Sequence, residues 1–437
     1  MNITVCGTGY VGLVAAVVFA AKGHKVVGLD IDEGKIELLR SGKSPLFEPG
    51  LEELMGESAE NLFFTSDYRE AYAGADIVFV AVPTPEKADG SAELSYVMAA
   101  CDRIAESRST GCYVVIKSTV PPGTNARIQA YFDGLTDEDS ARRFEVMSNP
   151  EFLSQGTALR DMLYPARVVV GVQSEDAAEL MRELYRPFDA PVMVMDLPSA
   201  ELVKYASNDF LALKISYINE IANLCDVVGA DIENVAAGMG ADPRIGNKFL
   251  RAGIGYGGSC FPKDTKALHW LSTCSGHEIK TIKAAIEVNT AQKATLVAKA
   301  KERHGSLADK RIAVLGLTFK PNTDDLRDAP SLDVVRMLSE EGALSVLYDP
   351  CGMPSFEKRF PASAGTIEYA DSARAALGRA DMAFILTEWD EFASIEPDEY
   401  RELMAVAEVY DGRNVYRPEA FVGTGVRYAS IGRPVVE

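Results

Sequence analysis

The chain has 437 residues, which is enough for two to four domains that each bury a hydrophobic core. Hydrophobic residues make up 47% and charged residues 25%, as in an ordinary globular enzyme. The net charge of −20 disfavours nonspecific binding to nucleic acid or to an anionic membrane. An anionic substrate would therefore need a local basic pocket.

The cysteines and histidines point to no disulfide framework and to no metal site. The seven cysteines include no CxxC pair, so reduced thiols in a cytoplasmic protein are the simplest interpretation. The four histidines include no HxH or HxxxH pair, so we expect no bound metal. The apolar run 11–21 is too short to cross a bilayer, and no charged segment or cleavage site precedes Asn2. We therefore expect neither secretion nor a membrane partner.

The first half of the chain alternates short apolar runs with helical patterns. This alternation is typical of a doubly wound α/β fold with a parallel sheet. The expected strands are 2–6, 25–29, 76–82, 113–117, 144–148 and 167–172.

The period changes after these strands. Apolar residues recur at helical spacing over 199–229 without an internal Gly or Pro, which predicts one helix of about 30 residues that bridges domains or forms a subunit interface. A second α/β unit begins at Arg311, and its expected strands are 312–315, 344–348 and 381–386. The sequence thus predicts two Rossmann-like domains, 1–195 and 308–437, joined by a central helical domain over 196–307.

A glycine motif lies between the first strand and the first helix. It reads Gly7-Thr8-Gly9-Tyr10-Val11-Gly12, and Asp30 follows at the end of the second strand. These glycines permit a tight turn against a pyrophosphate at a helix N-terminus, and Asp30 would accept hydrogen bonds from the adenosine ribose. A 2′-phosphate would meet that charge, so NAD is favoured over NADP. A glycine turn in a nucleotide-free fold is the alternative.

Two hydroxyl-bearing segments follow expected strands. They are Val82-Pro83-Thr84-Pro85 and Lys117-Ser118-Thr119-Val120-Pro121. The carboxyl ends of parallel strands are where doubly wound sheets bind ligands, so Thr84 and Thr119 are candidates to face cofactor or substrate. Each is equally well explained as a plain turn residue.

The stretch from Gly253 to Asp264 holds the most informative cysteine. Four glycines in six positions precede Cys260, and Lys263 and Asp264 follow it. A cysteine beside a helix start can have a lowered pKa and act as a nucleophile. A buried structural cysteine is the alternative.

Polar residues interrupt the long apolar helix. Lys204 and Asn208 lie four apart and share a face, and Asn219 returns to that side three turns later. A solvated polar face is the alternative, but it does not explain why Asn208 and Asn219 interrupt an otherwise apolar helix.

Taken together, the motifs resemble the UDP-glucose/GDP-mannose dehydrogenase family along nearly the whole chain. The matching segments, in order, are GTGYVG, VPTP, KSTVPPGT, NPEFL, KYASNDFLALKISYINE, GIGYGGSCFPKD, GLTFKPNTDDLR and TEWDEF. The resemblance implies an N-terminal NAD domain, a central helical core that forms a homodimer, and a C-terminal domain for a nucleotide sugar.

The resemblance also implies roles for particular residues. Cys260 would be the nucleophile, Lys204 and Asn208 would stabilise oxyanions, Asp264 and Thr119 would hold a water, and Glu151 would be a general base. Cofactor contacts are implied for Gly7, Gly9, Tyr10, Val11, Gly12, Asp30, Lys35, Thr84, Thr119, Glu151, Lys263 and Arg327. Substrate contacts are implied for Glu151, Phe152, Leu153, Lys204, Asn208, Arg244 of a partner subunit, Phe249, Tyr256, Gly257, Cys260, Phe319, Lys320 and Arg413. The chain departs from the family at Gln155, where a Glu is usual, which puts a base role there in doubt.

The implied reaction is the NAD-dependent, four-electron oxidation of UDP-glucose to UDP-glucuronate through a thiohemiacetal and a thioester on Cys260. GDP-mannose and UDP-N-acetylhexosamines are alternative substrates. Two other functions remain open: a two-electron β-hydroxyacid dehydrogenase and a nonenzymatic NAD or nucleotide-sugar binding protein. A β-hydroxyacid dehydrogenase would need neither Cys260 nor residues 311–437. A binding protein would not need the combination of Lys204, Asn208, Cys260 and Asp264.

Overall fold

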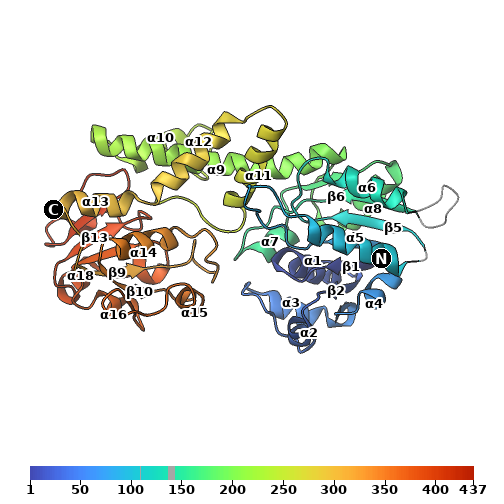
Figure 1. Ribbon diagram of the computed structural model, residues 1–437, viewed down its shortest axis with the longest axis horizontal. Helices are drawn as coiled ribbons and strands as arrows, with labels where there is room; N and C mark the ends of the chain where they lie inside the picture. Colours follow the sequence, from blue (N-terminus) through green and yellow to red (C-terminus); the bar gives the residue numbers. More distant parts are fainter. Residues whose placement is uncertain (109, 136–142) are drawn as a thin grey trace. The chain divides into compact units, whose positions relative to one another are not determined.

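The computed structural model describes residues 1–108, 110–135 and 143–437. The chain divides into two compact units, Met1–Ser207 and Asn208–Glu437. Each unit contains one β-sheet covered by helices (Figure 1). The boundary between the units falls inside helix α9 (Leu197–Val228).

The sheet of the first unit has the strand order β3-β2-β1-β4-β5-β6-β7-β8. Its strands are β1 (Asn2–Cys6), β2 (Lys25–Leu29), β3 (Leu62–Thr65), β4 (Ile77–Val80), β5 (Cys112–Ile116), β6 (Phe144–Ser148), β7 (Val168–Gly171) and β8 (Val192–Met195). Neighbours from β3 to β6 pair in parallel, as expected. The expectation of a parallel sheet is wrong at one place, because β6 meets β7 antiparallel at Ser148 and Gly171.

The helices of this unit connect the strands. They are α1 (Tyr10–Ala21), α2 (Glu33–Arg40), α3 (Leu51–Glu57), α4 (Tyr68–Ala73), α5 (Ser95–Ser107), α6 (Thr124–Asp133), α7 (Ala158–Leu163) and α8 (Glu175–Tyr185). Residues Gly12 to Ala20 of α1 are all buried, because the helix lies against the sheet with apolar side chains around its circumference.

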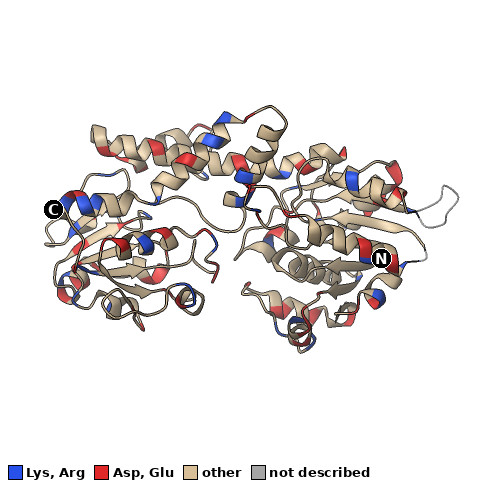
Figure 2. Cartoon of the chain, viewed as in Figure 1, with Lys and Arg blue, Asp and Glu red and all other residues tan. Residues whose placement is uncertain are grey.

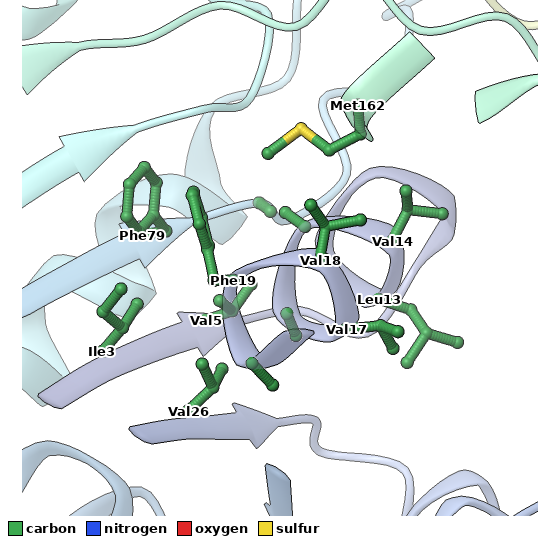
Figure 3. Packing of buried hydrophobic residues seen from close by; sticks show 14 of the residues in the cluster. Ile3, Val5, Leu13, Val14, Val17, Val18, Phe19, Val26, Phe79 and Met162 are labelled. Atoms are coloured by element: carbon green, nitrogen blue, oxygen red, sulfur yellow. The ribbon is translucent and has the colours of Figure 1, made fainter. Parts of the chain in front are cut away.

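The core of the first unit forms between α1 and the strands beneath it. Figure 3 shows Phe19 of α1 beside Val5 and Phe79 of the sheet, with Met162 of α7 above Val18 on the helix. The rings of Phe19 and Phe79 lie 5.0 Å apart. Burying one such side chain stabilises the fold by about 1.5–3 kcal/mol. The packing fixes α1, and therefore the glycine turn at its N-terminus.

Helix α9 is one continuous helix of 32 residues, as its apolar period predicts. At 1.5 Å per residue it is about 48 Å long. The remaining helices of the second unit are α10 (Ile232–Gly240), α11 (Phe261–Cys274), α12 (Lys280–Gln292), α13 (Thr295–His304), α14 (Pro330–Glu340), α15 (Met353–Glu357), α16 (Ala373–Leu377), α17 (Asp390–Ala393) and α18 (Pro397–Leu403).

The sheet of the second unit is parallel throughout, in the order β11-β10-β9-β12-β13-β14. Its strands are β9 (Arg311–Leu315), β10 (Leu344–Tyr348), β11 (Ile367–Tyr369), β12 (Met382–Ile385), β13 (Glu408–Asp411) and β14 (Arg427–Ser430). The expectation of a second α/β fold from Arg311 onward is therefore confirmed.

Charged residues concentrate on the helices and loops of both units, whereas the strands are mostly uncharged (Figure 2). This contrast follows from burial, because both sheets are covered by helices. Within the described ranges, no helix combines the length and the apolar character that crossing a bilayer would require.

Candidate functional site

The glycine turn after β1 has the shape of a dinucleotide cradle. Gly9 is the N-cap of α1, and a Cβ added to it would meet nothing within 4 Å. A Cβ on Gly12, by contrast, would lie 1.8 Å from the carbonyl oxygen of Gly7, so only glycine fits there. The turn is thus closed against its own chain and open at the helix N-terminus, the position at which dinucleotide-binding folds hold a pyrophosphate.

Asp30 lies beside this turn. Its Oδ2 accepts hydrogen bonds from the backbone N–H of Thr8 at 3.0 Å and from the Thr8 hydroxyl at 2.8 Å. Lys35 Nζ is 3.8 Å from the same oxygen. Burial raises the pKa of Asp30, but the hydrogen bonds from Asp32 and Thr8 and the charge of Lys35 outweigh it and hold the pKa below its usual value. Asp30 therefore carries a full negative charge at neutral pH.

Tyr10, at the first position of α1, connects the turn to a distant loop. Its hydroxyl hydrogen-bonds to the buried carboxylate of Glu48 and accepts the N–H of Gly156 at 2.8 Å. Glu48 also accepts that N–H at 2.8 Å. Sequence reasoning missed Glu48, which no motif singled out. Half-buried Gln155 directly precedes Gly156, so it lies beside this junction, and half-buried Val11 follows Tyr10.

The two hydroxyl segments lie together at the carboxyl ends of β4 and β5. The Thr84 hydroxyl donates a hydrogen bond of 3.0 Å to the backbone oxygen of Thr119. This contact fits the placement expected for the ends of neighbouring parallel strands.

The segment after β6 brings a carboxylate and a lysine together in the interior. Glu151 Oε1 and Lys204 Nζ are 2.8 Å apart, and their side chains are 7% and 3% exposed. Burial raises the pKa of Glu151, but Lys204, the Leu153 N–H and Lys117 lower it below its usual value. Lys204 also lies 5.5 Å above the ring of Phe152. The expected site residues of this segment are therefore gathered around one buried ion pair.

A second buried lysine, Lys117, belongs to the same cluster. It follows β5 directly, and its Nζ donates to Asn149 Oδ1 at 3.1 Å. Burial lowers the pKa of Lys117 to about 8, with Glu151 raising it and Lys204 lowering it. Sequence reasoning missed this charge, although a lysine directly after an apolar strand is an unusual residue to bury.

The first turn of α9 is fixed by Glu201. Its two carboxylate oxygens accept the N–H groups of Gly123 at 2.6 Å and Asn125 at 2.7 Å, at the start of α6. A carboxylate at a helix N-terminus is a stabilising arrangement. Because Lys204 follows one turn later, this contact helps to set its position.

In the second unit, Cys260 is the N-cap of α11 and is half-buried. The loop before it is held by side-chain amides. Asn219 of α9 accepts the N–H of Gly253 at 2.9 Å, and Gln292 donates to the Gly253 oxygen at 2.8 Å. Asn289 accepts a hydrogen bond from the backbone N–H of Tyr256 at 2.8 Å and donates one to the backbone oxygen of Tyr256 at 3.1 Å. Asn219 therefore positions the cysteine loop, which explains why an asparagine stands at this place in α9.

The glycines of this loop serve close packing within the chain. Gly255 has a φ of +94°, and a Cβ there would lie 2.7 Å from Asn289 Oδ1. A Cβ on Gly257 would lie 2.5 Å from the backbone oxygen of Asp328. The glycine pattern thus lets neighbouring segments approach the backbone of the loop.

Asn208, a second asparagine of α9, contacts the helix that follows Cys260. Its Nδ2 donates to Asp264 Oδ2 at 2.7 Å, and Lys263 Nζ lies 2.6 Å from Asp264 Oδ1. Asp264 is 1% exposed. The three expected site residues Asn208, Lys263 and Asp264 are therefore brought together as one hydrogen-bonded array.

Arg413 is half-buried, and its guanidinium is bonded to backbone oxygens. It donates to Leu386 at 2.9 Å, to Gly255 at 2.9 Å and to Phe319 at 3.4 Å. Burial lowers the pKa of Arg413. The guanidinium therefore supports the cysteine loop, whatever it binds in addition.

Aromatic residues flank the loop. Phe261 makes edge contacts with Tyr256 at 5.8 Å and with Phe249 at 6.2 Å, and Lys320 lies 5.5 Å from the ring of Phe319. Burial raises the pKa of Tyr256 to about 12, so its phenol is neutral at neutral pH.

Two expected arginines are exposed. Arg327 pairs with Asp325 at 2.6 Å, while its backbone oxygen accepts the N–H of Gly258 at 2.7 Å. Arg244 pairs with Asp242 at 2.6 Å, and its side chain is 88% exposed. Within the second unit, Arg327 is thus next to the cysteine loop, and Arg244 extends into solvent.

Three parts of the chain match consecutive domains of one enzyme family. Residues 1–189 match the NAD binding domain of the UDP-glucose/GDP-mannose dehydrogenase family, residues 198–291 its central domain and residues 313–418 its UDP binding domain. The chain belongs to the UDP-glucose/GDP-mannose dehydrogenase family. The expected family and fold are thereby confirmed, and so is NAD as the cofactor of this oxidoreductase.

Individual members of the family match the chain along its length. The UDP-glucose 6-dehydrogenase YwqF of Bacillus subtilis is 47% identical, over 100% of this chain and 98% of that protein. A UDP-glucose dehydrogenase structure from Pyrobaculum islandicum has a TM-score of 0.90 at 38% identity and covers 99% of this chain and 98% of its own. A UDP-D-ManNAc dehydrogenase structure from Pyrococcus horikoshii has a TM-score of 0.86 at 28% identity, with 99% of both chains covered.

Cofactor choice gives a first prediction for this family member. The charge of Asp30 should repel a 2′-phosphate, and a like-charge contact costs several kcal/mol. We expect kcat/KM for NAD to exceed that for NADP by at least about 10²-fold. Initial rates of reduced-cofactor formation measure the ratio.

The matched variants are Asp30→Asn and Asp32→Asn. Asp30→Asn keeps a hydrogen-bond acceptor for Thr8 and should reduce the ratio of kcat/KM for NAD to that for NADP. Asp32 caps α2, so Asp32→Asn should leave this ratio unchanged. Equal kcat/KM values for NAD and NADP in the wild-type protein would show that Asp30 does not select the cofactor.

Proposed function

We propose that the chain oxidises the CH₂OH group of UDP-glucose to a carboxylate, giving UDP-glucuronate. The observation that carries the proposal is Cys260 at the start of α11, beside the array of Asn208, Lys263 and Asp264. A thiol among fixed polar groups suits covalent capture of an aldehyde. The relatives that are named UDP-glucose dehydrogenases favour this substrate.

The covalent chemistry takes place on Cys260. When bound, NAD would supply the hydride acceptor, one molecule for each of the two oxidations. After the first oxidation, the Cys260 thiolate adds to the aldehyde and forms a thiohemiacetal. Loss of a second hydride from the same carbon leaves a thioester. Water then attacks the thioester, which releases the acid and returns the thiol.

The other site residues would stabilise charge and handle protons. We assign Lys204 and Asn208 to the oxyanions that develop, and a fixed donor of this kind is worth about 3 kcal/mol of barrier. Asp264 and Thr119 would hold the hydrolytic water. Glu151 would accept a proton from it, and the ionised state that Lys204 enforces is the form that such a base requires.

Basic residues would bind the diphosphate despite the overall charge of −20. We propose contacts from Lys320 and Arg413, with Tyr256, Phe249, Gly257 and Phe319 around the rest of the nucleotide sugar. Phe152 and Leu153 would line the sugar, and Lys263, Lys35 and Arg327 would contact NAD. The three-part division at 195/196 and 307/308 and a cytoplasmic location belong to the same proposal. All seven cysteines are free, which supports that location.

We also propose a homodimer formed through α9. Phe210, Tyr217 and Leu224 recur at intervals of seven residues and are each at least half exposed. Residues seven apart share one helix face, so these side chains form an apolar stripe that a second copy of the helix could cover. Exposed Arg244 would reach the site of the partner subunit from such a dimer.

A UDP-N-acetylhexosamine is the second candidate substrate. It is favoured by the fold similarity to the UDP-D-ManNAc dehydrogenase structure from Pyrococcus horikoshii. GDP-mannose is a third, because the family includes enzymes for it.

A substrate panel tests the proposal. Purified protein with NAD is offered UDP-glucose, UDP-N-acetylglucosamine, UDP-N-acetylmannosamine and GDP-mannose, and both NADH and the sugar acid are quantified. We expect the highest kcat/KM with UDP-glucose and two NADH per acid, because two hydrides leave one carbon. A ratio of one NADH per sugar would exclude the four-electron scheme, and preference for another sugar would move the assignment to it.

A further inference from the structure

Asp209 is a buried carboxyl group that the chemistry above does not use. It follows Asn208 on α9 and is 1% exposed. Within the described part of the chain, neither of its carboxylate oxygens has a hydrogen-bond partner. An ionised carboxylate in such a place is very costly, whereas the neutral acid is far less so.

The neighbouring carboxyl group, Asp264, has the opposite surroundings. One of its oxygens accepts a hydrogen bond from Asn208 and the other lies 2.6 Å from the Lys263 ammonium. Donors and a cation stabilise the charged form of a carboxyl group. Two carboxyl groups in one site do not readily ionise together, so the proton stays on the one that lacks donors.

The charged and titratable groups that act on Asp209 come from two segments. Asp264 and Lys263 lie on α11, and Tyr256 lies in the loop before it. The pKa of Asp209 is raised to about 8, chiefly by burial and also by the charge of Asp264, with Lys263 acting in the opposite direction. Tyr256 is neutral throughout this range. The geometry and the electrostatics thus agree that Asp209 holds a proton at neutral pH.

We propose that Asp209 is a positioning residue that, while protonated, leaves Asp264 as the single negative charge of the array with Asn208 and Lys263. When Asp209 loses its proton to solvent, a second negative charge appears beside Asp264. That charge competes for Lys263 and repels the anionic intermediates that Asn208 would stabilise. The effect on turnover rests on the proposed function, but the protonation state of Asp209 does not.

The kinetic test compares pH profiles. One unit above its pKa, about a tenth of a group remains protonated, so wild-type kcat/KM should fall about tenfold between about pH 7 and pH 9. In Asp209→Asn, which mimics the neutral acid, the ratio of the two values should fall to about two or less. Asp226→Asn is the matched control, since Asp226 is another α9 carboxylate and pairs with Lys299 at 2.7 Å. It should retain the wild-type decline.

A decline that persists in Asp209→Asn would overturn the proposal. Lys117, whose pKa burial lowers to about 8, would then be the group to examine.

A direct readout does not depend on turnover. Infrared difference spectra of the full chain between about pH 6.5 and pH 9.5 should show the loss of a protonated-carboxyl C=O band. The band should be absent in Asp209→Asn and present in Asp226→Asn. Its absence in the wild-type protein, or its persistence in Asp209→Asn, would overturn the inference. If no nucleotide sugar is oxidised but the band behaves as described, the proposed function fails and the protonation of Asp209 stands.

Stability supplies a third measurement. Because the folded-state pKa of Asp209 is above the unfolded value, the unfolded chain loses this proton first as pH rises from about 4 to about 8. The Tm of the wild-type protein should therefore fall relative to that of Asp209→Asn between about pH 4 and about pH 8. Above about pH 8 the difference in Tm should stay constant. A Tm difference that is constant with pH would contradict a protonated Asp209.

Discussion

Replacing Cys260 with alanine is expected to reduce formation of the sugar acid by at least roughly 10³-fold, the scale on which loss of a covalent nucleophile acts. Without the thiol, neither the thiohemiacetal nor the thioester can form. Slow aldehyde formation should persist, because the first hydride transfer uses other groups. Chromatographic quantification of acid and aldehyde, together with NADH, separates the two oxidations.

The control for this variant is Cys274→Ala. Cys274 is the exposed last residue of α11, the helix that Cys260 begins, so the control removes a thiol from the same element. It should turn over like the wild-type protein. Acid formation at the wild-type rate in Cys260→Ala would refute a covalent mechanism.

In Glu151→Gln, thioester hydrolysis is expected to slow more than either oxidation. About one equivalent of sugar should then accumulate on Cys260, visible as a mass adduct, with a burst of NADH before slow turnover. Intact-protein mass spectrometry and stopped-flow absorbance detect the two signals. An unchanged mass with a uniformly lower rate would show that Glu151 is not the base for hydrolysis.

The ion pair with Lys204 adds a consequence for the same variant. Removing the charge of Glu151 leaves a buried ammonium without its counter-ion, and breaking such a pair costs about 3–5 kcal/mol of stability. The variant should therefore melt at a lower temperature, so kinetics must be measured well below its Tm. Glu145→Gln is the matched control, since Glu145 lies on β6 and accepts a hydrogen bond of 2.7 Å from the hydroxyl of partly buried Ser174. It should give neither adduct nor burst.

Local sequence signals predicted the elements that carry local motifs. The glycine turn, the long helix and the cysteine loop could each be recognised from a short stretch of sequence, because glycine spacing and helical period are local properties. Short strands were missed where the apolar pattern breaks. β3 and β8 expose Phe63 and Met193, and buried β13 carries Glu408 and Asp411. One partner of Glu408, His304, lies 104 residues earlier in the chain.

The burial and the charge state of polar residues inside the site could not be predicted, because they depend on residues that are distant in sequence. The charge state of Lys117 depends on its contacts with Asn149 and Glu151. That of Asp209 depends on Asp264, which lies more than 50 residues later in the chain. A sequence shows that such residues are polar. Only the fold shows which of them are buried and which charges face them.

The amide side chains around the cysteine loop have a consequence for how this protein responds to its medium. Asn219, Asn289 and Gln292 carry no charge at any ordinary pH, and Arg413, which also holds the loop, stays protonated. The scaffold of the nucleophile therefore does not titrate, and its buried contacts are little screened by salt. Acid or alkali short of unfolding should leave the loop in its place, so that a pH profile of this protein reports the protons of its reacting groups and their neighbours.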